Sequence, residues 1–200
     1  SQAGKFQKAL SQISCGDEAW EEYIQVFFGY CITGHVDEQV AAFLIGVGAN
    51  GKSLLIKIIS RVIAEYAKTT PYRTFLASNN GQTGNDIARL QGCRFVTVVE
   101  TNKSDKLNEA VFKEITGGDV QCARYLYQEF FEFNPKAKLV LAVNHMPRVS
   151  TGNDSVQRRI KCVPFDAKFE GKTNNKTLAK ELEEEKCGIL NWLVEGAQKW

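Results

Sequence analysis

Apolar residues recur along the chain with two different periods, and these periods predict where helices and strands lie. Spacings of three to four residues, typical of one buried helical face, occur in residues 3–34, 53–66, 105–116 and 176–200. Short continuous runs rich in β-branched and aromatic residues predict buried strands at 40–45, 94–100, 138–144 and 160–165. Buried strands that alternate with helices predict an α/β fold.

Two of the predicted strands end in a single polar residue. The run RFVTVVE ends at Glu100, and the run KLVLAVN ends at Asn144. Ligands of open α/β sheets bind at the carboxyl edge of the sheet, which is where strand ends of this kind meet. The pattern therefore predicts a ligand site to which Glu100 and Asn144 contribute.

A glycine-rich turn joins the strand at 40–45 to the helix at 53–66. It reads GVGANGKS, with the spacing G-x-x-x-x-G-K-S of the loop whose backbone N–H groups cradle nucleotide phosphates. Such a stretch can be no more than a turn, but the strand before it and the helix after it favour a nucleotide site. The residues expected to hold the nucleotide are Gly46, Gly48, Ala49, Asn50, Gly51, Lys52, Ser53 and Leu54.

Composition narrows the class of protein only a little. Two hundred residues suit one domain with a helical annex, and a net charge of +2 neither proves nor excludes a nucleic-acid partner. The six cysteines show none of the short spacings of zinc or redox sites, which predicts reduced thiols. No membrane span or leader is evident, so we expect a cytoplasmic protein. The only methionine is Met146, which suggests a piece of a longer polypeptide.

Hydrolysis of a nucleoside triphosphate also needs a metal, an oriented water and positive charge near the transferred phosphoryl group. Ser53 is a candidate Mg²⁺ ligand, and Glu100 is the candidate base that orients the water. Asn144 could hydrogen-bond both the water and the γ-phosphate, since its amide offers a donor and an acceptor. As alternatives, Glu100 could be a solvated acid at a strand end, and Asn144 could cap the turn before Pro147.

Arg158 and Arg159 follow a loop that contains proline and glycine. They could act across a subunit boundary as an arginine finger, although paired arginines are also common partners in surface ion pairs.

The motifs follow one another in a fixed order: GVGANGKS, RFVTVVETN, KEITGGD, ARYLY, LAVNHMP and NDSVQRRIKCVPF. This order resembles the superfamily 3 helicase domain, in the branch found in plasmid, phage and poxvirus-type primase-helicases, and it covers about residues 20–200. The resemblance implies an AAA+-like P-loop NTPase with a parallel sheet flanked by helices and a β-hairpin insertion. It also implies a small N-terminal helical segment, residues 1–36, before an ATPase domain at 37–200.

The resemblance assigns roles to individual residues. Lys52 and Ser53 match the Walker A pair, Glu100 the Walker B acid and Asn144 the sensor 1 asparagine. Arg159 best matches the arginine finger, with Arg158 second. Residues 113–119 match the B′ motif. Thr101 departs from the wider superfamily, where many members place a second acid.

The resemblance further implies a DNA-contacting hairpin between the B′ helix and the Asn144 strand. Cationic side chains would meet phosphates there, and a tyrosine could stack on a base, although Tyr125 and Tyr127 could instead be cross-strand packing residues. The expected DNA-binding residues are Lys113, Arg124, Tyr125, Tyr127 and Gln128.

The function implied by the resemblance is that of an ATP-dependent DNA helicase motor in DNA replication. It would use ATP and Mg²⁺, form a homo-oligomeric ring, usually a hexamer, and translocate on single-stranded DNA to open forked DNA. A primase domain would lie upstream in the full-length chain, and a viral or phage protein would act in the host cytoplasm. Two alternatives remain: a P-loop NTPase that drives packaging or remodelling, and a nucleotide-gated module that loads partners at an origin.

Overall fold

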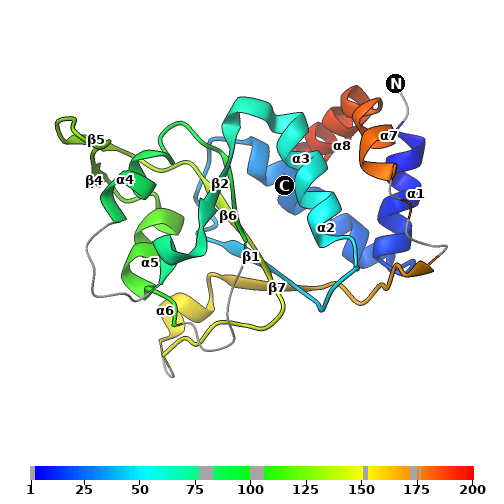
Figure 1. Cartoon of the computed structure of the whole chain (residues 1–200), viewed down its shortest axis with the longest axis horizontal. Coiled ribbons are helices and arrows are strands. Elements are labelled where there is room, and N and C mark those ends of the chain that lie inside the picture. The colour runs from blue at the N-terminus through cyan, green and yellow to red at the C-terminus, as the bar shows by residue number, and fades with distance from the viewer. Residues whose placement is uncertain (1–2, 77–82, 100–105, 151–152, 172–174, 176) are drawn as a thin grey trace. The chain divides into compact units, whose positions relative to one another are not determined.

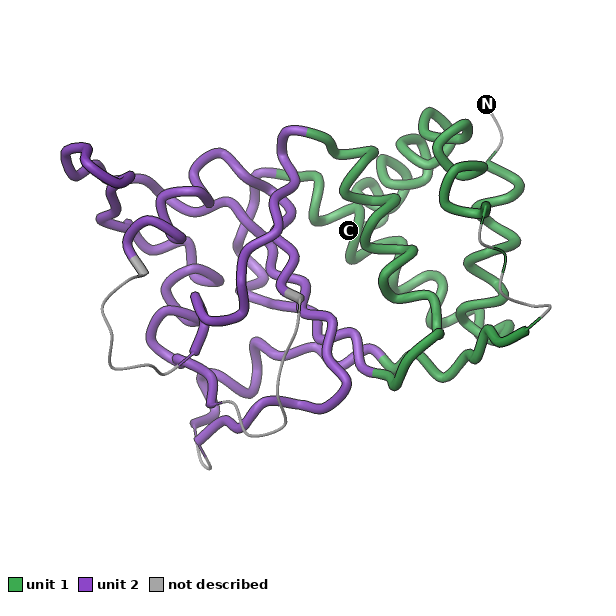
Figure 2. The backbone as a smooth tube through the Cα atoms, in the orientation of Figure 1, with its two compact units in different colours: residues 1–33, 46–64, 164–200 green, residues 34–45, 65–163 purple. Residues whose placement is uncertain are grey.

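The protein, seen here in a computed structural model, divides into two compact units that are described separately (Figure 1, Figure 2). The described residues are 3–76, 83–99, 106–150, 153–171, 175 and 177–200. Unit 1 comprises residues 1–33, 46–64 and 164–200, and unit 2 comprises residues 34–45 and 65–163. The N-terminal helices thus share a unit with the C-terminal helices, and the domain boundary expected after residue 36 stays a prediction.

A five-stranded sheet forms the centre of unit 2, with the strand order β2-β3-β6-β1-β7. Its strands are β1 (Ala41–Ile45), β2 (Ala67–Pro71), β3 (Phe95–Val99), β6 (Lys138–Val143) and β7 (Ile160–Pro164). The four strands from β2 to β1 pair in parallel. The strands expected from apolar runs are confirmed, whereas β2 was missed because its sequence, AKTTP, is polar and partly exposed at the sheet edge.

The register of the central strands brings their carboxyl ends to one level. Ile45, the last residue of β1, pairs with Val143, the last residue of β6. Val99, which ends β3, pairs with Ala142 of β6. The carboxyl ends of these three strands therefore lie at the same edge of the sheet, which is the edge where open α/β sheets bind ligands.

The rest of unit 2 consists of short helices and a hairpin: η2 (Tyr72–Phe75), α4 (Thr83–Ala88), α5 (Glu109–Gly117), α6 (Asp154–Gln157), β4 (Gln121–Ala123) and β5 (Phe131–Phe133). The side chain of Asn108 caps the start of α5 by accepting a hydrogen bond from the N–H of Val111 (3.3 Å). Gly118, with φ 74°, ends α5 in the left-handed conformation. The fully buried Phe112 of α5 packs near Phe43 of β1, with ring centroids 6.2 Å apart.

Unit 1 is helical and contains α1 (Gly4–Ile13), α2 (Glu18–Ile32), α3 (Lys52–Ile63), α7 (Leu178–Glu183) and α8 (Lys186–Lys199). The short helix η1 (Ala64–Tyr66) follows α3 and belongs mostly to unit 2. Helices α2 and α8 touch backbone to backbone, because a Cβ at Gly29 would lie 2.2 Å from the nitrogen of Ala197. A Cβ at Gly196 would lie 2.1 Å from the carbonyl oxygen of Gln25. Gly188 lies buried inside α8.

Within the described part of the chain, none of the helices combines the length and hydropathy that crossing a bilayer requires. All six cysteines are free.

Candidate functional site

The turn between β1 and α3 has an unusual run of left-handed backbone. Gly48, Ala49 and Gly51 have φ values of 57°, 31° and 89°. Backbone in this region turns successive N–H groups toward one side, which is the geometry of an anion-binding nest. No side chain caps the start of the following helix α3, so none of its first N–H groups is bonded to a capping side chain.

The three glycines of the loop serve different purposes. A Cβ on Gly46 would lie 2.3 Å from the amide nitrogen of Asn50 and 2.5 Å from the carbonyl oxygen of Phe165, and one on Gly51 would lie 2.6 Å from Ile13. Gly48 has no atom within 4 Å of such a Cβ. Gly46 and Gly51 are therefore required by packing against other protein atoms, and of the three glycines only Gly48 borders open space. The sequence, in contrast, predicted that all three would approach an anion.

Lys52 lies folded over this loop and is only 6% exposed. Its ammonium donates hydrogen bonds to the carbonyl oxygen of Gly46 and to Oδ1 of Asn50, the latter at 3.0 Å. Burial lowers the pKa of the Lys52 ammonium. Both of its partners are neutral, so the positive charge is not cancelled by a carboxylate and is suited to an anionic ligand.

The loop is anchored to the segment after β7. Asn50 donates from its side-chain amide to the carbonyl oxygen of Phe165 (3.3 Å). The N–H of Phe169 donates to the carbonyl oxygen of Ala49 (2.7 Å). Ser53, the second residue of α3, is exposed, so its hydroxyl is accessible to a metal ion. The chemistry of the loop residues thus fits a phosphate group with its Mg²⁺, and their role in holding a nucleotide stays a prediction.

The other predicted catalytic residues belong to unit 2. Asn144 directly follows the last residue of β6 and is exposed. Glu100 lies outside the described residues, as does Thr101, and Glu100 follows Val99 at the end of β3. The catalytic roles of Glu100 and Asn144 therefore stay predictions.

The two arginines after α6 differ in exposure. Arg159 is 8% exposed, and its guanidinium donates to the carbonyl oxygen of Ser155 (2.6 Å) and to Oε1 of Gln39 (2.8 Å). Arg158 is exposed and donates to the same Oε1 (3.2 Å). The sequence ranked Arg159 first as the residue that reaches a neighbouring subunit, whereas its burial and bonding within its own unit leave Arg158 as the accessible one.

The expected hairpin is present and carries an exposed aromatic tip. Strands β4 and β5 pair antiparallel, and Tyr127 between them is fully exposed with φ 63°. Tyr125 is partly buried, stacks on Phe131 (centroids 5.6 Å apart) and donates its hydroxyl to the carbonyl oxygen of Ala88 (3.1 Å). The two tyrosines thus divide: Tyr125 is a packing residue, and Tyr127 is free to contact a ligand.

Of the remaining predicted DNA-binding residues, Arg124 and Gln128 are exposed in the hairpin, and Lys113 is partly buried on α5. Sequence reasoning missed Phe130, which is 62% exposed and lies under the guanidinium of Arg124 at 4.7 Å from the ring centroid. The available signal was an aromatic residue in the predicted DNA-contacting hairpin, only two positions after Gln128. Gln39 was also missed, and nothing in its sequence context singled it out.

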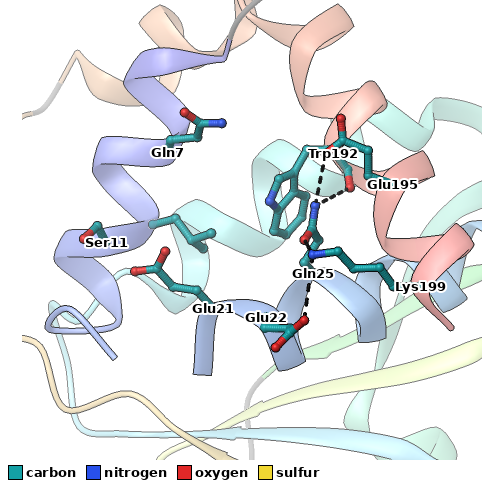
Figure 3. A pocket seen from close by; sticks show the side chains of 9 residues that line it. Gln7, Ser11, Glu21, Glu22, Gln25, Trp192, Glu195 and Lys199 are labelled. Atoms are coloured by element: carbon teal, nitrogen blue, oxygen red, sulfur yellow. Dashed lines mark hydrogen bonds and ion pairs between the residues drawn. The ribbon is translucent and has the colours of Figure 1, made fainter. Parts of the chain in front are cut away.

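A separate pocket of about 540 Å³ lies in unit 1 between α1, α2 and α8 (Figure 3). Several of its polar groups bind one another: Lys199 donates to Gln25 (2.8 Å) and pairs with Glu22 (3.9 Å), and Gln25 donates to the carbonyl oxygen of Trp192 (3.1 Å). None of the predicted site residues lines it.

A parallel sheet whose first strand leads through a glycine turn and a lysine into a helix defines a P-loop α/β domain. The chain belongs to the family described as "Family of unknown function (DUF5906)", whose model matches residues 44–159. Its fold is that of superfamily 3 helicase domains. The NrS-1 C terminal region matches with a TM-score of 0.74 at 15% identity, over 97% of this chain and 46% of that one, and JCV helicase with 0.50 at 12%, over 96% and 52%.

Curated relatives come from large DNA viruses. A protein of Acanthamoeba polyphaga mimivirus named "Putative helicase" is 33% identical over 155 residues, which is 76% of this chain and 16% of the relative. A Frog virus 3 protein with the same description is 28% identical over 138 residues, 66% of this chain and 14% of the relative. The chain therefore spans about one sixth or less of the length of these relatives.

Proposed function

We propose that this chain is the ATP-dependent motor domain of a replicative DNA helicase. It binds ATP with Mg²⁺ in the loop at 46–53, hydrolyses it at subunit interfaces of a homo-oligomeric, hexameric ring, and moves along single-stranded DNA. The relatives named as helicases support the class of activity. A relative in African swine fever virus named as a primase supports a primase domain elsewhere in the full-length chain.

The observation that carries the proposal is the phosphate loop. It combines left-handed backbone at three positions, an uncapped helix start and a buried lysine whose charge is not neutralised. Lys52 would exchange the oxygens of Gly46 and Asn50 for those of the outer phosphates, and Ser53 would help to hold the metal. Bound Mg²⁺ would supply positive charge that neutralises the phosphate oxygens.

The register of the sheet in unit 2 brings the carboxyl ends of β1, β3 and β6 to one edge. The loop begins directly after Ile45, whose partner Val143 immediately precedes Asn144. Glu100 follows the end of the next strand over. In this proposal Glu100 takes the proton of the attacking water and assists Ser53 with the metal. Asn144 holds that water against the γ-phosphate.

The hairpin is the proposed DNA contact. Tyr127 and the pair formed by Phe130 and Arg124 offer π-faces on which bases can stack, at about 1–3 kcal/mol per base in other single-strand binders. Arg124 and Lys113 would meet phosphates, and Gln128 would add a polar contact. One hairpin with so little charge binds weakly, but several copies around one strand raise the effective concentration.

Steady-state ATPase assays with and without single-stranded DNA test the proposal, together with displacement of a strand from a forked duplex. We expect DNA to stimulate hydrolysis and Lys52→Ala to abolish it. Lys57→Ala is the matched control, because Lys57 is an exposed lysine of the same helix. Mass measurement with an ATP analogue and single-stranded DNA checks for the ring.

The outcomes separate the alternatives. ATPase activity that ignores DNA would favour a motor for packaging or remodelling. Nucleotide-dependent assembly without strand displacement would favour an origin-loading module. Equal activity of Lys52→Ala and the wild-type chain would refute the nucleotide site itself.

A further inference from the structure

A single side-chain oxygen contacts both arginines that follow α6. Oε1 of Gln39 accepts a hydrogen bond from Nη2 of Arg159 at 2.8 Å and from Nη2 of Arg158 at 3.2 Å. All three residues belong to unit 2. Gln39 has φ 51°, a conformation that residues with a side chain seldom adopt, and its N–H donates to the carbonyl oxygen of Val36 (2.9 Å). This strained turn aims the amide at the arginine pair.

Arg159 is fixed within its own unit. Besides the bond to Gln39, its Nη1 donates to the carbonyl oxygen of Ser155 at 2.6 Å, and its own carbonyl oxygen accepts from the N–H of Ala41 at 2.8 Å. The nearby carboxylate of Asp119 favours the charged form of the Arg159 guanidinium. Withdrawing this guanidinium would break both side-chain hydrogen bonds and leave the carbonyl oxygen of Ser155 without this donor. Arg159 is therefore an anchor.

Arg158 is held differently. It is exposed, and the hydrogen bond to Gln39 limits the rotamers of its long side chain, so less rotamer entropy is lost when it meets a ligand. The ion pairs between described residues include neither Arg158 nor Arg159. Arg158 thus offers a pre-oriented guanidinium whose full charge is available to an anion.

We propose that Gln39 is a positioning residue that presents Arg158, rather than Arg159, to the nucleotide of a neighbouring copy. This inference rests on the proposed ATPase function. A glutamine suits the task because its amide oxygen has two lone pairs and can accept from both guanidinium groups without cancelling either charge. A glutamate would hold the arginines more strongly but would neutralise the charge that acts on the γ-phosphate.

The substitution Gln39→Glu tests whether Gln39 positions Arg158 for the reaction or only stabilises the fold. We expect it to lower kcat of the DNA-stimulated ATPase by about tenfold or more, because it removes part of an effect that reaches about 10³–10⁵ for arginine fingers. KM for ATP should not rise, because the phosphate loop is untouched. The melting temperature should not fall, because the new carboxylate pairs with two cations. The matched control is Gln157→Glu, the same change of charge at an exposed glutamine next to Arg158, and it should leave kcat unchanged.

Two further variants assign the arginines. Arg158→Ala should lower kcat by about 10³-fold at an unchanged melting temperature. Arg159→Ala should lower the melting temperature. Mixing Arg158→Ala with Lys52→Ala subunits should restore part of the activity, because some interfaces then combine an intact loop with an intact arginine.

A wild-type kcat in Gln39→Glu, or in Arg158→Ala, would overturn this inference while leaving the ATPase proposal in place. A wild-type chain with no ATPase activity would instead refute the proposed function, and the inference with it.

Discussion

Exchanging the loop glycines for alanine distinguishes two reasons for a glycine: the lack of space for a side chain and the need for a left-handed backbone. Gly46→Ala places a methyl group 2.5 Å from the carbonyl oxygen of Phe165 and 2.3 Å from the amide of Asn50. Gly48→Ala places it in open space but keeps a φ of 57°. The first change is a steric clash with protein, and the second is a cost in backbone conformation.

The two costs differ in size. Overpacking costs about 1–3 kcal/mol, and because the carbonyl oxygen of Phe165 is a backbone atom that cannot swing aside, we expect the upper end, about 3 kcal/mol. A left-handed alanine costs about 1 kcal/mol. For a chain of this length each kcal/mol shifts the melting temperature by about 2–4 °C. Gly46→Ala should therefore lose about 6–12 °C and Gly48→Ala about 2–4 °C.

Thermal unfolding followed by circular dichroism measures these shifts, and a fluorescent ATP analogue measures the affinity of the loop. In binding experiments carried out below both melting temperatures, we expect Gly48→Ala to lose more affinity for the ATP analogue than Gly46→Ala. The methyl group of Gly48→Ala occupies the space proposed for phosphate and should weaken binding more than it weakens the fold. Equal losses of stability in the two variants, or a larger loss for Gly48→Ala, would refute the packing role assigned to Gly46.

Two further predictions concern unit 2. Glu109 accepts hydrogen bonds from the N–H of Ser150 (2.6 Å) and from the amide of Asn153, which lower its pKa below 4.5. Its stabilising effect is therefore present above about pH 4.5 and is lost as the pH falls through the lowered value, so Glu109→Gln should flatten the acid side of the curve of melting temperature against pH. In the hairpin, Tyr125→Phe should cost about 1 kcal/mol of stability by removing one hydrogen bond. Tyr127→Ala should leave the melting temperature unchanged and weaken the binding of single-stranded DNA, measured by fluorescence anisotropy. If only Tyr125→Phe weakened DNA binding, the roles assigned to the two tyrosines would be contradicted.

The central strands and the loop could be predicted from the sequence because their signals are local. A buried parallel strand needs apolar side chains on both faces, so β1, β3, β6 and β7 stand out as apolar runs. The G-x-x-x-x-G-K-S spacing is equally local, since it encodes one turn and the helix start that follows. The edge strand β2 carries no such signal, because half of its surface meets solvent.

Tertiary structure alone decided which residues meet across long sequence separations. Gly46 is needed because of Phe165, more than a hundred residues away, and the accessible arginine is Arg158 because Gln39 and Ser155 hold its neighbour. Such contacts depend on where the chain returns after several elements, and no spacing along the sequence encodes them. The sequence by itself determined the four apolar strands, the glycine-rich loop and the hairpin. The fold decided what each glycine, tyrosine and arginine within them touches.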